Sequence, residues 1–131
     1  MTNLTALPNT EKSKIMDQGL TLAQWAYLTP RLKAFSVIQY AKDMEMESFD
    51  YLYILKSLEV FEAFVAEAHR VVSSGKTHYS ARTITEYLRH NTAVTDSEAV
   101  FKINNHLIPK MARLSMQLFP LLNGLFEVRG K

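Results

Sequence analysis

The chain has 131 residues, of which 47% are hydrophobic and 21% are charged, and it contains no cysteine. This length is enough for one hydrophobic core, and the composition is that of a globular protein, not of a disordered one. The lack of cysteine excludes disulfides, thiolate metal ligands and a cysteine nucleophile. We therefore expect a single domain over residues 1–131.

The N-terminal stretch lacks the charged start and apolar segment of a secretory signal, and no run approaches the about 18 apolar residues of a membrane helix. These features predict a cytoplasmic protein without membrane contact. The net charge of +2 is unevenly divided: residues 1–75 hold seven basic and nine acidic residues, whereas residues 76–131 hold eight basic and four acidic ones. This division suggests that the second half faces an anionic partner.

Residues 1–13 are polar and are expected to be flexible, and residues 14–47 are expected to form N-terminal helices. A short helix within residues 20–28 should end before Pro30. The next segment, residues 31–46, has the pattern of a one-sided amphipathic helix. Its buried stripe is predicted to include Leu32, Phe35 and Ile38.

Residues 48–73 are predicted to form one long helix, with Ser48 as its N-cap and Gly75 beyond its end. Apolar residues recur along it at alternating spacings of three and four, the pattern of a heptad seam. Two interpretations remain open. The helix is either the central core helix of a monomer or part of a homodimer interface. The predicted dimer contacts are Tyr51, Ile54, Leu58, Phe61 and Val65.

After Gly75 the pattern changes to short elements. "KTHYS" is predicted to be extended, and Ser80 to cap a helix over residues 80–90. Residues 91–105 form a polar connection that ends in "VFKIN", a short strand or an extended arm. A further helix is predicted at about 106–119, because Pro109 is tolerated only near a helix start and Pro120 would end it. A turn at residues 123–124 and a terminal strand in "LFEVR" follow.

The helix at 106–119 has two distinct faces. Leu107, Met111, Leu114 and Leu118 form an apolar stripe, whereas His106, Lys110, Arg113 and Gln117 form a polar one. No Asp or Glu occurs between Ala99 and Phe126. The solvated face of an ordinary helix carries both basic and acidic side chains. A face with basic side chains alone therefore favours an anionic partner. A helix of this length fits the major groove of DNA.

Arg and Lys can hold phosphates or read guanine, and Asn and Gln can pair with adenine. Side chains at a helix N-terminus are also well placed for phosphate. The predicted DNA contacts are Arg82, Arg89, Lys102, Asn104, Asn105, His106, Lys110, Arg113, Gln117 and Arg129.

The order of elements over residues 49–131 resembles a winged helix-turn-helix. In this comparison residues 49–73 are the leading helix, 80–90 the support helix, 106–119 the recognition helix, and "NGLFEVRGK" the wing. The resemblance implies a mainly α fold in which a helical N-terminal half precedes a winged-helix-like unit with one or two short strands. It implies a transcriptional or mobile-element regulator that binds double-stranded DNA. "SARTI", "FKINN" and "LFEVR" are also similar to stretches of bacterial and phage proteins that carry no assigned function.

Catalytic and metal-binding patterns are missing. The chain has no H-E-x-x-H motif, and "GKT" at residues 75–77 lacks the upstream glycine of a P-loop. We therefore expect no enzyme activity, metal or cofactor. His69 is expected to be either a surface residue or a helix-end residue, where positive charge is favourable. The alternative function is a protein–protein adaptor or inhibitor with a winged-helix-like shape, favoured by the modest net charge and the wide apolar surface of residues 48–73.

Overall fold

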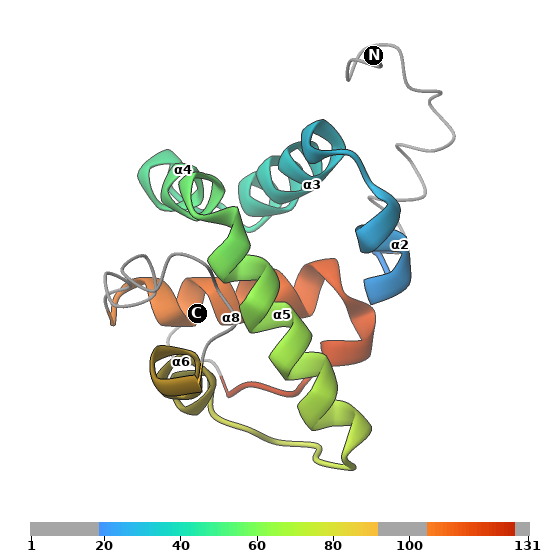
Figure 1. Ribbon diagram of the computed structural model, residues 1–131. Coiled ribbons are helices and arrows are strands. Elements are labelled where there is room, and N and C mark those ends of the chain that lie inside the picture. The colour runs from blue at the N-terminus through green and yellow to red at the C-terminus, as the bar shows by residue number, and fades with distance from the viewer. Residues whose placement is uncertain (1–18, 92–104, 128–131) are drawn as a thin grey trace.

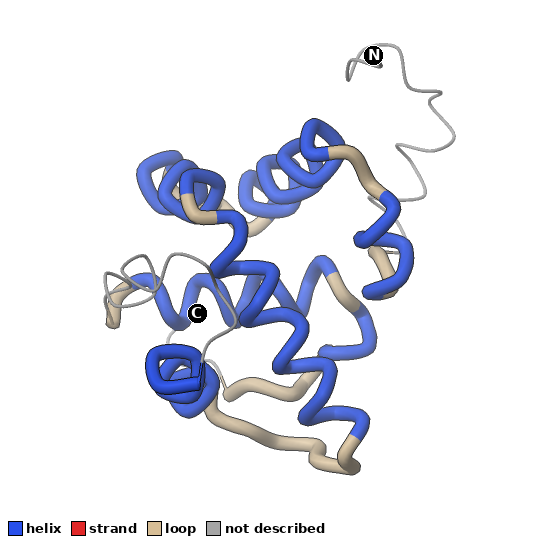
Figure 2. Tube along the Cα trace, in the orientation of Figure 1, coloured by secondary structure: helices blue, strands red, loops and turns tan. Residues whose placement is uncertain are grey.

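The computed structural model describes residues 19–91 and 105–127. These residues contain six α-helices and one 3-10 helix. They are α2 (Leu22–Tyr27), α3 (Pro30–Asp43), α4 (Ser48–Lys56), α5 (Leu58–Ser73), α6 (Ala81–Asn91), α8 (Leu107–Leu118) and η2 (Pro120–Leu122). The mainly α class is confirmed. The strands of a winged-helix unit are not seen in the described residues (Figure 2). The predictions for residues 1–13 and for most of the connection at 91–105 lie outside them.

Helix α8 runs through the middle of the molecule (Figure 1). Helices α3 and α4 pack against it on one side and α6 on another, and η2 follows at its C-terminal end. Its buried residues are Leu107, Ile108, Met111, Ala112, Leu114, Ser115 and Leu118. Because so many neighbours cover α8, only one stripe of its surface remains for a partner.

The predicted helices at 80–90 and 106–119 are confirmed as α6 and α8. The Ser80 hydroxyl accepts a hydrogen bond from the Thr83 N–H at 3.1 Å, which caps α6 as expected. Pro109 lies in the first turn of α8, where no intrahelical bond is lost. Phe119 is extended, with φ −118° and ψ 96°, as a residue before proline prefers, so α8 ends before Pro120.

The single helix predicted over residues 48–73 is wrong, because the chain breaks at Ser57. This residue has φ −124° and ψ 51°, outside the helical region, and separates α4 from α5. Helix α4 then packs against α3 and α8, while α5 turns away to pack against α6 and η2 (Figure 1). One straight helix could not lie along both sets of neighbours. The apolar residues before and after Ser57 therefore do not form one continuous buried stripe.

The two N-terminal helices are confirmed, and each has a side-chain cap. Thr21 and Gln24 form a capping box at α2, and the Thr29 hydroxyl accepts a hydrogen bond from the Leu32 N–H at the start of α3. The predicted buried stripe of α3 is wrong. Leu32, Phe35 and Ile38 are only half-buried. The buried side chains of α3 are Ser36, Val37, Tyr40 and Ala41. The helix is apolar on both faces, and its packing against α8 selects this one.

Trp25 anchors α2 in the core. Its ring is 3% exposed and packs edge-on against Phe61 and Phe119, with ring centroids 6.2 and 5.5 Å apart. Its indole N–H donates to Glu62 Oε2 at 2.9 Å, and Lys33 pairs with the same carboxylate oxygen at 2.6 Å. This buried polar group is therefore satisfied, as the burial of an indole requires.

Gly19 brings the start of the described chain against the end of α8. Its φ is +71°, and the N–H of Leu20 donates to the carbonyl of Leu118 at 2.8 Å. A Cβ at Gly19 would lie 2.7 Å from Pro120 Cδ and 2.9 Å from the Leu118 carbonyl oxygen. Glycine is therefore required here both for the backbone conformation and for the close approach.

His69 is buried, so the expectation that it lies at the surface is wrong. It is 7% exposed and its ring packs edge-on against Phe119, with ring centroids 5.4 Å apart. Its Nδ1 lies 2.8 Å from the Val65 carbonyl oxygen and must carry the proton, because a carbonyl can only accept. Within the described residues its Nε2 has no hydrogen-bond partner. The imidazole therefore behaves as a core side chain.

Candidate binding groove between α6 and α8

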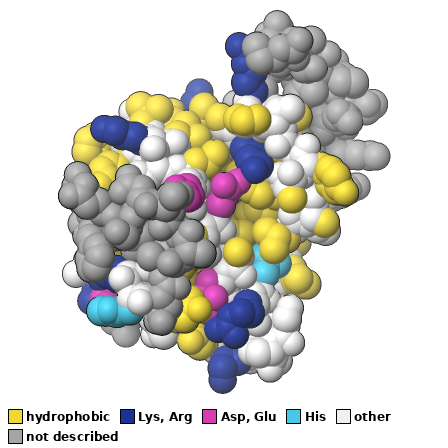
Figure 3. Space-filling model, viewed as in Figure 1, with side chains coloured by type: hydrophobic (Ala, Val, Ile, Leu, Met, Phe, Trp, Pro, Cys, Tyr) yellow, Lys and Arg dark blue, Asp and Glu magenta, His cyan; other side chains and the backbone are white. Residues whose placement is uncertain are grey.

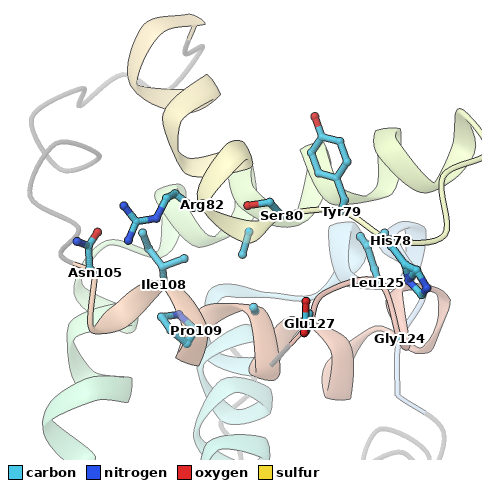
Figure 4. Close-up of a pocket in the computed structure, with 12 residues that line it drawn as sticks. His78, Tyr79, Ser80, Arg82, Asn105, Ile108, Pro109, Gly124, Leu125 and Glu127 are labelled. Carbon is cyan, nitrogen blue, oxygen red and sulfur yellow. The ribbon is translucent and has the colours of Figure 1, made fainter. Parts of the chain in front are cut away.

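An open groove of about 840 Å³ lies between the start of α6, the first half of α8 and the segment 124–127 (Figure 4). Its lining residues are His78, Tyr79, Ser80, Ala81, Arg82, Asn105, Ile108, Pro109, Ala112, Gly124, Leu125 and Glu127. They come from three stretches that are far apart in the sequence. We refer to this space below as the α6–α8 groove.

The floor of the groove is apolar. Ile108, Ala112 and Leu125 are exposed by only 5%, 2% and 2% respectively. The N–H of Tyr79 donates to the Leu125 carbonyl at 2.9 Å, and Tyr79 and Phe126 form a parallel bridge. This pairing ties the chain before α6 to the chain after η2, so two extended segments form one wall of the groove. The predicted wing strand is not seen in the described residues 125–127, where Phe126 forms only this isolated parallel bridge.

The rim of the groove is polar, and its charges are separated. Arg82 and Asn105 lie at one end, while His78 and Gly124 lie at the other (Figure 4). Both Arg82 and Asn105 are exposed. Within the described residues Arg82 makes no ion pair. The groove therefore offers an unpaired guanidinium and an amide beside an apolar floor.

The sequence suggested that no carboxylate lies beside the polar stripe of α8, but the structure places one there. Asp50, in the first turn of α4, is 3% exposed and approaches α8. Its two carboxylate oxygens lie 3.4 Å from His106 Nε2 and 3.4 Å from Lys110 Nζ. The Lys110 side chain is only 26% exposed. Two of the predicted DNA contacts are thus gathered around a buried acid from another helix.

The remaining predicted DNA contacts differ in their exposure and in their ion pairs. Arg89 pairs with Glu86 at 2.7 Å and its side chain is 17% exposed, so it is largely covered. Arg113 is half-buried and Gln117 is exposed on the outer stripe of α8. Lys102, Asn104 and Arg129 lie outside the described residues. The structure therefore brings together Arg82 with Asn105, and separately His106 with Lys110.

The predicted dimer contacts lie mostly in the core. Ile54, Phe61 and Val65 are each at most 2% exposed, and Tyr51 and Leu58 are half-buried. The interpretation of the seam as core packing agrees with this burial. The homodimer stays a prediction, and it would need a surface other than the three buried side chains. On α4 the exposed apolar residues are Phe49 and Leu52, at 75% and 55%.

Sequence reasoning missed Asp50 and most of the groove. No role for Asp50 is predicted from the sequence, since nothing local connects it with Lys110. Among the lining residues, the extended character of "KTHYS" was a signal for the wall at His78 and Tyr79. The strand predicted in "LFEVR" indicated that Leu125 and Glu127 are extended, but it did not indicate that they lie beside α6 and α8.

Figure 3 shows no large patch of one charge on the face that it draws. On the face drawn in Figure 3, Lys and Arg side chains stand in separate small groups among hydrophobic and acidic ones. No three His, Cys, Asp or Glu residues of the described ranges 19–91 and 105–127 come together as a metal-binding group. None of the described helices is long and apolar enough to cross a membrane. The α6–α8 groove is therefore the candidate site that the geometry favours.

Comparisons of the chain with protein-family models, with curated proteins and with solved structures find no match.

Proposed function

We propose that the protein is a protein-binding module, an adaptor or inhibitor, that holds a segment of its partner in the α6–α8 groove. The observation that carries this proposal is the open groove of about 840 Å³ with an apolar floor and a polar rim. Its volume lies within the roughly 300–1,000 Å³ of typical ligand sites, and an apolar floor with few polar groups is their usual chemistry. Binding, not catalysis, is proposed because His78, Arg82 and Glu127 form no ion pairs with one another in the described structure.

A substitution that fills the α6–α8 groove should weaken the binding of peptides to the protein. Pro109 is exposed and lines the groove, so a Pro109→Trp substitution places a large ring over the floor. We expect peptides selected from a random library on the full-length protein to bind the Pro109→Trp variant at least about tenfold more weakly, a loss of about 1.4 kcal/mol. Isothermal titration calorimetry with the selected peptides measures the affinities.

Leu121→Trp is the matched control, because Leu121 is 64% exposed and lies outside the groove. It adds the same ring and should leave the affinities unchanged. Thermal unfolding of both variants checks that they are folded. Either of two results contradicts the proposal: no peptide is enriched, or the enriched peptides bind the Pro109→Trp variant as well as the parent protein.

DNA binding is a second candidate function, and a specific observation favours it. Arg82 and Arg113 lie on the two helices predicted to face DNA, and neither makes an ion pair within the described part of the chain. Gln117 is exposed beside them on α8. Three points weaken this candidate: Lys110 and His106 face Asp50, Arg89 is paired with Glu86, and no wing strand is seen in the described residues.

Fluorescence anisotropy with a labelled random-sequence duplex tests the second candidate at about 50 and 200 mM salt. If DNA is the partner, affinity should fall steeply with salt, and an Arg82→Glu, Arg113→Glu double variant should reduce the slope by about 2. Lys110 is left unchanged because its substitution would disturb Asp50. No binding at the lower salt concentration rules against DNA.

A further inference from the structure

The chemistry of the α6–α8 groove defines its occupant more closely than a protein partner in general, and this step rests on the proposed function. The groove has two features that a ligand must match. One is the guanidinium of Arg82, which has no ion pair within residues 19–91 and 105–127 and lies with Asn105 at one end of the groove (Figure 4). The other is the buried apolar floor of Ile108, Ala112 and Leu125.

The cationic end needs an acid. A planar guanidinium makes its strongest hydrogen bonds to a carboxylate or a phosphate, which can engage two N–H groups at once. The Asn105 amide can donate to the same group. Among the described carboxylates, Glu86 pairs with Arg89, Glu67 with Arg70 and Asp50 with Lys110, and none forms an ion pair with Arg82. The acid at Arg82 is therefore expected from the partner.

The apolar floor decides between a nucleic acid and a peptide. A phosphodiester chain has no apolar group to cover Ile108 and Leu125, whereas a peptide can place an apolar side chain there. Because Ile108, Ala112 and Leu125 are already at most 5% exposed, the favourable contribution comes from the apolar side chain of the peptide, which leaves water when it packs against them. Charge complementarity and the floor together favour a peptide with an acidic side chain.

The wall of the groove fixes the spacing within that peptide. Residues 78–80 and 125–127 are not helical, Gly124 before the second stretch is a turn residue with φ +82°, and Tyr79 bridges Phe126. A ligand lying along this wall matches it best when extended. In an extended chain alternate side chains point to the same side, so two neighbouring contacts on one side belong to residues i and i+2.

We infer that the α6–α8 groove binds an extended internal segment of a partner protein in which an Asp or Glu residue lies two positions from a large apolar residue. The carboxylate pairs with Arg82 and Asn105. The apolar side chain covers Ile108, Ala112 and Leu125. Glu127 and His78 lie toward the other end of the groove, where Glu127 disfavours a second acid on the ligand.

A library of random octapeptides, acetylated and amidated so that it carries no terminal charge, tests this inference on the full-length protein. We expect enrichment of Asp or Glu two positions from Leu, Ile, Met or Phe. With an Arg82→Glu variant as bait, the acid should be replaced by Lys or Arg. The best acidic peptide should bind this variant at least about tenfold more weakly, since hydrogen bonds to charged groups are the stronger ones.

Arg31→Glu is the matched control, because Arg31 is exposed on α3 and does not line the groove. It makes the same change in net charge and should keep the acidic preference. The Arg82→Glu variant is expected to fold, since the first turn of α6 has no acid and a carboxylate there is favourable.

The outcomes separate this inference from the proposed function. Peptides that lose binding to Pro109→Trp but show no acidic preference overturn the inference and leave the proposed function standing. Peptides that bind only with a free C-terminal carboxylate also overturn it, because the occupant would then be a chain end. A library without any enriched peptide overturns both.

Discussion

Replacing Lys110 with glutamate is expected to lower the free energy of unfolding by about 3 kcal/mol, the lower end of the range for breaking a buried ion pair. Asp50 is 3% exposed and its carboxylate lies 3.4 Å from Lys110 Nζ. Glutamate would turn this attraction into repulsion and leave Asp50 facing the His106 imidazole, whose Nε2 lies 3.4 Å from the other carboxylate oxygen. We take the lower end because the Lys110 side chain is 26% exposed and water screens part of the interaction.

A double-mutant cycle identifies Asp50 as the cause. In an Asp50→Asn background the repulsion is removed, so Lys110→Glu should cost less than about 1 kcal/mol there. Urea denaturation followed by circular dichroism measures all four proteins. Equal costs in the two backgrounds would show that the ion pair contributes nothing. Arg113→Glu is the control on the same helix and should change stability by only about 0.5 kcal/mol.

The ion pair also shows why the function assigned from sequence had to be reconsidered. A row of basic side chains without an acid on the same helix suggested an anionic ligand. The acid is present, but it comes from α4, 60 positions earlier in the numbering. Whether a charge is neutralised depends on tertiary contacts, and no local spacing reports them. Arg82 and Arg113 remain without an ion pair among the described residues. Arg82 supplies the charge in both candidate functions, and Arg113 in DNA binding alone.

Local signals were sufficient for α6 and α8. The Ser80 cap, Pro109 in a first turn and Pro120 beyond the helix act within one or two turns of the chain, and the observed boundaries lie within one residue of the predicted ones. The break at Ser57 is different. Apolar spacings of three and four continue through it, because α4 and α5 each need their own apolar face. The break exists because the two helices have different neighbours, which the pattern does not contain.

The groove could not be predicted for a related reason. Its wall depends on the bridge between Tyr79 and Phe126 and its floor on residues of α8 and of the segment after η2. The order of elements did resemble a winged helix-turn-helix, and an extended segment before α6 does pair with one after α8. In the described residues this pairing is parallel and limited to one bridge, so the space beside it stays open as a groove.

Replacing Phe119 with alanine is expected to lower the free energy of unfolding by about 4 kcal/mol, within the range for removal of a buried aromatic ring. Phe119 is fully buried between α8 and η2. Its ring packs edge-on against Trp25 of α2 and His69 of α5, with ring centroids 5.5 and 5.4 Å apart. The substitution would leave a cavity where three elements meet. A domain of this size is stabilised by only about 5–15 kcal/mol, so much of the stability would be lost.

Phe49→Ala is the matched control for this change, because it removes the same ring from a site that is 75% exposed. Urea denaturation should show a loss of about 0.5 kcal/mol or less for Phe49→Ala. Phe119→Leu, which refills most of the cavity, should recover more than half of the loss. Comparable losses for Phe119→Ala and Phe49→Ala would contradict the packing described here. Such a result would mean either that the ring of Phe119 is not enclosed or that a second molecule covers the surface of α4 in solution. Measuring the Phe49→Ala loss at several protein concentrations separates these two explanations, because only association depends on concentration.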